Sequence, residues 1–276
     1  MPDKFFRSVL PGEPREAPKI DNSVAHIARV YDYWLGGKDN FAIDREVGDR
    51  ALDAHPETVL SVKANRRFLA RSVRHLAARE GIRQFLDVGT GLPSANNTHE
   101  VAQAAVPRAR VVYVDNDPIV LAHARALLTS SPEGETAYLD ADLKDTDEIL
   151  AGAAQVLDFS QPVGVMLVAV LHMLRDAEDP QGVVDRLMAA VPPGSFLVIS
   201  HLASDVQQEA MAEMGRRLNQ AMTQQFTMRS HAQVTAFFDR LTLLEPGVVL
   251  THQWRPDSAA DAETPGVLWA GVARKG

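Results

Sequence analysis

The stretch Gln84-Phe-Leu-Asp-Val-Gly-Thr-Gly-Leu-Pro-Ser94 decides the fold of this chain. Its apolar run is too short for a helix, and Gly89 and Gly91 follow it at once, so it predicts a buried strand that enters a tight turn. Because glycine has no Cβ, such a turn adopts positive φ angles and lets the backbone come close to a bound molecule. The stretch therefore predicts a ligand site at the end of a strand.

A second strand is predicted at Val111-Val-Tyr-Val-Asp115, which is rich in β-branched residues and ends in a carboxylate. Asp115 follows Gly91 by 24 residues, close to the interval of roughly 20 residues at which an acid reaches the ribose hydroxyls of a bound nucleoside. A helix over residues 95–106 would point its N-terminal amides at the ligand. These parts form one mononucleotide-binding unit, although a turn that merely needs two glycines would give the same local pattern.

The class of ligand follows from departures from the dinucleotide-binding fingerprint. The third glycine is absent, and Pro93 and Ser94 stand where that motif would tighten, which argues against NAD. Asp87 comes just before the turn, where its carboxylate can face an ammonium group. We therefore predict S-adenosylmethionine as the cofactor and keep an NAD-dependent oxidoreductase as an alternative.

The composition is that of an ordinary globular protein, with 276 residues of which 46% are hydrophobic and 23% are charged. A net charge of −8 works against non-specific binding to nucleic acid or to anionic membranes. The chain has no cysteine, and its histidines lack the spacing of a zinc site, so we predict no disulfide and no metal. We find no signal peptide and no apolar run of about 18 residues, and therefore expect a cytoplasmic protein with a small-molecule substrate.

We divide the chain into three parts. Residues 1–20 contain four prolines among charged residues and predict a flexible N-terminal arm. Residues 21–80 predict a helical cap, with one helix that begins from the N-cap residues Asp21-Asn22-Ser23 and stops at Gly36-Gly37, and a longer one over residues 56–79. The basic residues of the longer helix suit either a solvated face or nucleic acid, and the acidic chain favours the former. Residues 81–276 predict the S-adenosylmethionine-binding domain. In this part we expect helices over residues 119–128 and 206–222 and short strands at Leu243-Leu244 and over residues 248–252.

Three blocks of the sequence occur in an informative order: Tyr31-Asp-Tyr-Trp-Leu-Gly-Gly-Lys-Asp-Asn40, Ala64-Asn-Arg-Arg-Phe68 and Asp87-Val-Gly-Thr-Gly-Leu-Pro93. In these blocks the chain resembles the actinobacterial S-adenosylmethionine-dependent methyltransferases long catalogued as a domain of unknown function. The resemblance implies a class I methyltransferase, which has a Rossmann-like α/β fold with a seven-stranded, mostly parallel sheet, flanking helices and a final antiparallel hairpin. It does not supply the methyl acceptor.

The resemblance also implies where the cofactor binds. In class I enzymes the acid after the third strand accepts a hydrogen bond from the adenine amino group, and the next residue packs on the ring. Asp142 and Leu143 are the matching positions after a strand over residues 136–140, with Asp140 close by. The residues that we predict to contact the cofactor are Tyr33, Asp87, Gly89, Thr90, Gly91, Asp115, Asn116, Asp142 and Leu143.

Methyl transfer depends mainly on positioning, but a hydroxyl or a protonated amine needs a base. His172 and His201 follow predicted strands over residues 163–171 and 195–200, and we predict that His172 is catalytic. A satisfied interior histidine is the alternative for both. Residues 31–40 are predicted to close over the cofactor as a lid, or else to pack as an anchor. The predicted function is methyl transfer to an unidentified small molecule, with a non-catalytic cofactor-binding sensor as the alternative.

Overall fold

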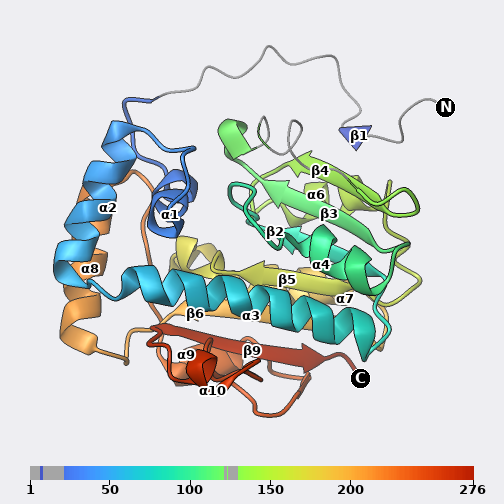
Figure 1. Ribbon diagram of the computed structural model, residues 1–276. Helices are drawn as coiled ribbons and strands as arrows, with labels where there is room; N and C mark the ends of the chain where they lie inside the picture. Colours follow the sequence, from blue (N-terminus) through green and yellow to red (C-terminus); the bar gives the residue numbers. More distant parts are fainter. Residues whose placement is uncertain (1–6, 9–21, 121–122, 124–129) are drawn as a thin grey trace.

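The computed structural model describes residues 7–8, 22–120, 123 and 130–276, and it shows a twisted central sheet with helices on both faces (Figure 1). The long strands are β2 (Gln84–Val88), β3 (Arg110–Asp115), β4 (Glu135–Asp140), β5 (Gly164–Val168), β6 (Phe196–Leu202) and β9 (Leu268–Arg274). Three two-residue strands complete the described sheet: β1 (Arg7–Ser8), β7 (Thr242–Leu243) and β8 (Val249–Leu250). The order is β1-β4-β3-β2-β5-β6-β9-β7, and β8 also pairs with β9.

The directions of the strands place the ligand site. β4, β3, β2, β5 and β6 are parallel, whereas β9 is antiparallel to β6. Every residue of β2 and β5 is buried, as expected for parallel strands that are covered on both faces. After β2 the chain adds β3 and β4 on one side and then crosses to β5 on the other side. The carboxyl ends of β2 and β5 therefore flank a topological switch point, where ligands bind in such sheets.

The fold class was predicted correctly, but the described sheet has nine strands rather than seven. One addition is β1, which pairs with β4. The other arises because the predicted pieces Leu243-Leu244 and Val248 to His252 form two separate strands, divided by a turn in which the amide of Gly247 donates to the carbonyl of Leu244. The two remaining pieces, β7 and β8, each pair antiparallel with β9, so the antiparallel end of the sheet agrees with the sequence prediction.

The helices form two groups. Those along the sheet are α3 (Thr58–Ala78), α4 (Thr98–Ala105), α6 (Thr146–Ala153), α7 (Pro180–Ala189), α9 (His231–Ala236) and α10 (Ala259–Ala262), with short turns η1 (Leu171–Met173) and η2 (Asp176–Glu178). Those beyond the carboxyl edge of the sheet are α1 (Ile27–Leu35), α2 (Ala42–Ala54) and α8 (Gln208–Ala221) (Figure 1). We call α1, α2 and α8 the cap helices. They overhang the switch point.

The cap helices have an apolar core of their own. Trp34 of α1, Val47 of α2 and Met211, Met214 and Leu218 of α8 pack in one buried cluster. The cap is therefore assembled from two distant parts of the chain, because α8 packs against α2. The predicted division at residue 80 does not include α8 in the cap, and as a domain boundary it remains a prediction.

The bounds of the long helices agree closely with the bounds that the helical repeat of apolar residues predicts. The predicted helix over residues 56–79 is α3, and that over residues 206–222 is α8. The first cap helix begins after His26 rather than at Asp21-Asn22-Ser23. The helix predicted after β3 begins at Pro118, and most of it lies outside the described residues, as does most of the predicted arm over residues 1–20.

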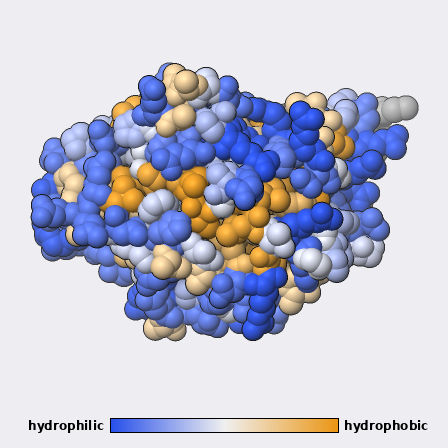
Figure 2. All heavy atoms as spheres, turned by 90° about the horizontal axis from the view of Figure 1, so that it is seen from below, coloured by the Kyte–Doolittle hydropathy of each residue, from blue (hydrophilic) through white to orange (hydrophobic). Residues whose placement is uncertain are grey.

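Apolar side chains gather in a central band on the underside of the molecule, with polar side chains around it (Figure 2). Among the large apolar side chains that the structure describes, Val24 and Leu60 are the exposed ones. The band therefore consists of side chains that are individually partly buried. In the described part of the chain, no helix combines the length and the apolar character that crossing a bilayer requires.

Candidate functional site

A cavity of about 430 Å³ opens at the switch point, between the carboxyl edge of the sheet and the cap. The sheet contributes the glycine turn after β2, the exits of β3 and β4, and the segment after β5. The other walls come from α1, from the middle of α3 and from residues 223–225 after α8. Of the residues predicted to contact the cofactor, those that line this cavity are Asp87, Gly89, Thr90, Gly91, Asp115, Asn116, Asp142 and Leu143.

The glycine turn has the backbone conformation that the sequence predicts. Gly89 has φ +75° and Gly91 has φ +67°. A Cβ on Gly89 would lie 2.2 Å from Val170 Cγ2, whereas a Cβ on Gly91 would meet nothing within 4 Å. Gly89 is therefore required by close packing within the protein, and Gly91 leaves open space toward the cavity.

Asp87 lies at the end of β2 and is buried. Burial raises the pKa of its carboxyl to about 6, although the Thr98 hydroxyl, which donates to Asp87 Oδ2 over 2.6 Å, and the nearby Arg66 oppose the shift. An ionised carboxylate in such a place is costly unless a cation faces it. The cavity next to Asp87 thus suits a ligand that carries an ammonium group.

Asp115 lies at the end of β3 and holds the glycine turn. Its Oδ2 accepts from the amide of Gly91 over 2.8 Å, and its Oδ1 accepts from the amide of Asp117 over 3.0 Å. Burial raises the pKa of Asp115, and these two amide hydrogen bonds oppose that shift. Each carboxylate oxygen has a second lone pair, so Asp115 can fix the turn and also accept from ligand hydroxyls.

The exits of β3 and β4 form a further wall. The side-chain Nδ2 of Asn116 donates to Asp142 Oδ2 over 3.1 Å, and the backbone amide of Lys144 donates to Asp142 Oδ1 over 2.9 Å. Leu143 is 8% exposed and presents an apolar surface at the cavity. A fixed carboxylate beside an apolar side chain suits a heteroaromatic ring with an amino group.

The prediction for Tyr33 is not supported, because its side chain lies outside the cavity. The Tyr33 hydroxyl donates to Asp49 of α2 over 2.6 Å. Tyr31 lines the cavity instead, and its hydroxyl accepts from Asn65 Nδ2 over 3.0 Å. Residues two apart on a helix point to nearly opposite sides, so α1 can present only one of these tyrosines to the ligand.

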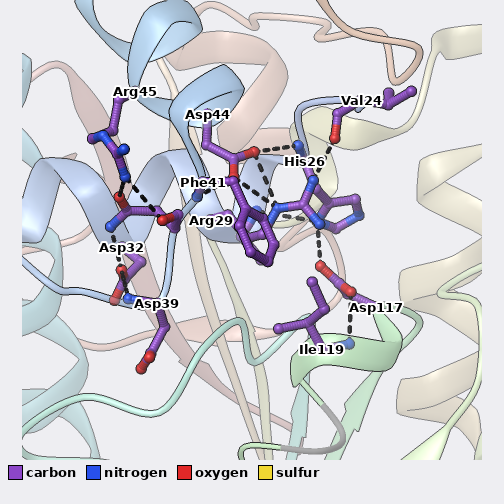
Figure 3. Close-up of polar contacts among 12 residues, drawn as sticks. Val24, His26, Arg29, Asp32, Asp39, Phe41, Asp44, Arg45, Asp117 and Ile119 are labelled. Atoms are coloured by element: carbon purple, nitrogen blue, oxygen red, sulfur yellow. Dashed lines mark hydrogen bonds and ion pairs between the residues drawn. The ribbon is translucent and has the colours of Figure 1, made fainter. Parts of the chain in front are cut away.

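The loop between α1 and α2 is held in place by side-chain hydrogen bonds. The Asp32 carboxylate accepts from the backbone amide of Asp39 over 2.9 Å and from Asn40 Nδ2 over 2.8 Å. Arg45 in turn donates to the backbone carbonyl of Asn40 (Figure 3). Asp32 and Leu35 line the cavity, but Asn40 does not. The lid function of residues 31–40 remains a prediction.

The two predicted bases lie behind the cavity wall. The chain turns sharply after β5, where Ala169 has φ +56°, and this turn carries His172 into η1. The His172 ring stacks on Phe226 with ring centroids 5.6 Å apart. Burial lowers the pKa of His172 well below its ordinary value, and the nearby His201 adds to the shift. His172 does not line the cavity, so the geometry does not support a catalytic role for it.

His201 is a satisfied interior histidine. Its Nδ1 hydrogen-bonds the carbonyl of Leu202 over 2.9 Å, and its Nε2 accepts from the buried Arg229 over 2.9 Å. Burial lowers the pKa of His201 to about 3, so its ring is neutral and has no free nitrogen for a ligand. The alternative that the sequence left open is therefore correct for His201.

Several polar residues that line the cavity were not predicted from the sequence, and they include His26, Asn65, Arg66 and Gln224. Asn65 and Arg66 could have been predicted as site residues, because they belong to the block Ala64–Phe68 that carries the resemblance. His26 and Gln224 have no local signal, since they come from segments 198 residues apart. Other basic side chains of α3 face the C-terminal part of the chain, where Arg67 pairs with Asp261 and Arg74 with Asp257.

Comparison with known proteins agrees with this geometry. Residues 13–276 match the family described as S-adenosyl methyltransferase. A crystal structure of a DUF574 family protein from Streptomyces avermitilis is 42% identical, with coverage of 94% of this chain and 100% of that chain and a TM-score of 0.90. A protein from Thermobifida fusca is 41% identical, with coverage of 94% and 97% and a TM-score of 0.85.

More distant similarity concerns the fold alone. The plantazolicin methyltransferase BpumL, in complex with a monoazolic desmethylPZN analog and SAH, is 12% identical and gives a TM-score of 0.51 over 90% of this chain. A comparison with curated proteins found no match. The buried Asp87, the open turn at Gly91 and the Asp142–Leu143 wall suit the ammonium, the sugar and the purine of S-adenosylmethionine. The chain belongs to the S-adenosyl methyltransferase family and is an S-adenosylmethionine-dependent methyltransferase with a class I fold.

Proposed function

We propose that the chain transfers the methyl group of S-adenosylmethionine to a small molecule bound in the same cavity. The observation that carries this proposal is the cavity itself. Its volume of about 430 Å³ lies within the range of roughly 300–1,000 Å³ of small-molecule sites. Helix α1 and residues 223–225 form its wall on the side of the cap, whereas a macromolecular acceptor would need a site open along one face.

In this proposal the cofactor lies along the sheet edge. Asp87 receives the ammonium group, Asp115 accepts from the ribose hydroxyls, and Asp142 with Leu143 holds the adenine. All three carboxylates are already oriented by hydrogen bonds from Thr98, Gly91 and Lys144. Little rearrangement is then needed when the cofactor binds, which lowers the entropic cost of binding.

The acceptor would bind against a rigid polar wall. The Ser200 hydroxyl donates to Asn65 Oδ1 over 2.6 Å, Asn65 Nδ2 donates to the Tyr31 hydroxyl over 3.0 Å, and that hydroxyl reaches the carbonyl of Val62 over 3.2 Å. S-adenosylmethionine itself supplies the activated methyl group. The work of the chain is to hold the two reactants in a near-attack geometry, which can supply about 7–11 kcal/mol.

The first test is calorimetry with S-adenosylmethionine and S-adenosylhomocysteine, with NAD as the control. We expect both sulfur compounds to bind and NAD not to bind. Methyl-labelled cofactor is then incubated with a cell extract, and the label is counted in small molecules and in macromolecules separately. We expect label in the small molecules, and much less with Asp115→Asn. Label found only in protein or nucleic acid would refute the small-molecule proposal.

A further inference from the structure

His26 is the described histidine whose side chain lines the cavity. It lies immediately before α1, at the junction of the cap and the sheet, and its side chain is 24% exposed. Its Nδ1 lies 2.8 Å from Oδ2 of Asp117, which follows β3 (Figure 3). This links an imidazole at a ligand cavity to a buried carboxylate, as in the histidine–carboxylate pairs that serve as general bases.

The carboxylate of this pair is ionised and fixed. Asp117 is 4% exposed, and its Oδ1 accepts from the amide of Ile119 over 2.9 Å. Burial opposes ionisation of Asp117, but the contact with His26 and the amide of Ile119 outweigh it and lower the pKa of this carboxyl. The Nδ1 proton therefore points at Asp117. The backbone amide of Ala28 lies 3.3 Å from Nδ1 and could donate to it only in the other tautomer, but the carboxylate of Asp117 at 2.8 Å is the closer partner.

The imidazole is also held from the cap side. The backbone amide of His26 donates to Asp44 Oδ1 over 3.0 Å. Asp44 is fully buried and accepts from Arg29 Nε over 3.0 and 2.9 Å at its two oxygens and from the amide of Phe41 over 2.8 Å (Figure 3). Arg29 donates further to the carbonyl of Val24. The ring thus has little freedom to turn.

With Nδ1 protonated, Nε2 of His26 carries the lone pair. Its neighbour is the side-chain amide of Gln224, whose Nε2 lies 3.3 Å away. Oε1 of Gln224 is buried and has no hydrogen-bond partner among the described residues. The lone pair on Nε2 therefore accepts from Gln224 Nε2, and Oε1 of Gln224 is left as an acceptor without a partner in the described part of the chain. A ligand hydroxyl that binds His26 here would take the place of the Gln224 amide at Nε2. A ligand that donates a hydrogen bond would satisfy this end.

We propose that His26, oriented by Asp117, is the general base that removes the proton of the methyl acceptor, and that the acceptor group is a hydroxyl of phenolic type. The inference rests on the proposed function. The hydroxyl proton passes to Nε2 while the oxygen forms its bond to the methyl carbon. The electron pair of the breaking S–C bond stays on sulfur, so the products are a methyl ether, S-adenosylhomocysteine and a protonated His26. Asp117 stabilises the imidazolium and is a positioning residue.

A phenolic hydroxyl suits this base better than an aliphatic alcohol. Phenols of the tyrosine type ionise near pH 10, within a few units of an imidazole, and proton transfer is efficient when the two acidities are close. The charged groups around His26 are the carboxylates of Asp117 and Asp115 on the sheet side and the Arg29–Asp44 pair on the cap side.

The test is a series of pH–rate profiles with labelled S-adenosylmethionine and a panel of simple phenols. The proteins are the wild type, His26→Gln, Asp117→Asn and the control His123→Gln. His123 also joins the sheet side to the cap, since its Nδ1 lies 3.5 Å from Asp39, but it does not line the cavity. The dissociation constant of S-adenosylhomocysteine and the melting temperature are measured for each protein.

We expect His26→Gln to lower kcat by at least about 100-fold, the usual contribution of a general base, and to lose the rise of rate with pH. Its dissociation constant for S-adenosylhomocysteine should stay within about twofold of the wild type. Asp117→Asn should shift the profile, and His123→Gln should match the wild type. If His26→Gln destabilises the fold, added imidazole should still restore turnover to His26→Ala.

The two levels of the proposal fail in different ways. Methyl ethers formed by the wild type support the proposed function whatever the variants do. Turnover of His26→Gln equal to that of the wild type, or cofactor binding weakened as much as turnover, overturns the role of His26 as a base. N-methylated rather than O-methylated products overturn the assignment of the acceptor group.

Discussion

At the scale of single residues, Arg66 has an unmatched donor at the cavity. Its Nη2 makes long hydrogen bonds, of 3.2 and 3.4 Å, to the carbonyls of Ala95 and Asn96. Its Nε is buried and has no partner among the described residues. Because Arg66 lies near Asp87, a ligand whose ammonium faces Asp87 would bring its carboxylate toward Arg66.

We expect Arg66→Gln to weaken binding of S-adenosylhomocysteine by about tenfold or more, since a hydrogen bond to a charged group contributes about 1.5–3 kcal/mol. Binding of the decarboxylated analogue should not change. Arg67→Gln is the matched control, because Arg67 pairs with Asp261 at the surface. Calorimetry with both ligands decides the matter, and an equal loss for the two ligands would mean that Arg66 only shapes the turn.

The raised pKa of Asp87 predicts a pH dependence of cofactor binding. The pKa is about 6 in the folded chain, above the ordinary value, so the folded chain holds this proton more tightly than the unfolded chain does. Protonation therefore stabilises the unliganded fold as the pH falls through 6, and it competes with the ligand ammonium.

Binding of S-adenosylhomocysteine should accordingly weaken by about tenfold at one pH unit below this pKa, because the ionised form is then about a tenth of the population. Asp87→Asn should bind weakly at all pH values and show a flatter profile. Calorimetric titrations between pH 5 and 8 measure both. A wild-type affinity that is constant over this range would mean that Asp87 does not face the ammonium.

At the scale of elements, the α1–α2 loop depends on one close approach. A Cβ on Gly37 would lie 1.9 Å from Asp32 Oδ1, whereas a Cβ on Gly36 would meet nothing within 4 Å. Gly37→Ala should displace the Asp32 carboxylate from the amide of Asp39, and we expect a loss of about 2–3 kcal/mol in unfolding free energy.

Gly36→Ala should cost only the strain of a left-handed residue, about 1–2 kcal/mol, because Gly36 has φ +83°. Chemical denaturation of the two variants measures the difference. If Gly36→Ala proves the more damaging, the Asp32 network does not stabilise the loop.

At the scale of the whole molecule, the cap is joined to the sheet by polar contacts as well as by packing. The buried Arg29–Asp44 pair joins α1 to the start of α2, and His26 carries that network to Asp117 beside the glycine turn. A buried ion pair adds little stability over an apolar packing, but it fixes one arrangement because a partial loss leaves a buried charge. The orientation of the cap over the cavity is fixed in this way.

Local pattern was sufficient for much of the sheet and for the cofactor side of the cavity. Phe85 to Val88 and Val111 to Val114 are short apolar runs that only a buried parallel strand explains, and the side chains that follow such strands must meet at one edge. This is why the local pattern predicted Asp87, Gly91 and Asp115. The family resemblance supplied the role of Asp142 and Leu143.

The local sequence pattern did not predict which way a side chain points in two places. One is α1, where residues two positions apart lie on opposite sides of the helix, and the other is the turn that follows β5. Tyr33 and Tyr31 are equally aromatic in sequence, and only the packing of α1 on α2 sends one to Asp49 and the other to the cavity. His172 follows β5, but the turn at Ala169 carries it behind the wall.

The sequence by itself determined the fold class, the glycine turn and the carboxylates at the strand ends, because these depend on hydrophobic periodicity and on the common direction of parallel strands. Only the tertiary structure decided which residues complete the cavity on the side of the cap. His26, Asn65, Asp117 and Gln224 lie on four separate segments, and no sequence period links them. They meet because the cap helices close over the sheet edge, and that arrangement depends on packing between segments that are distant in the chain.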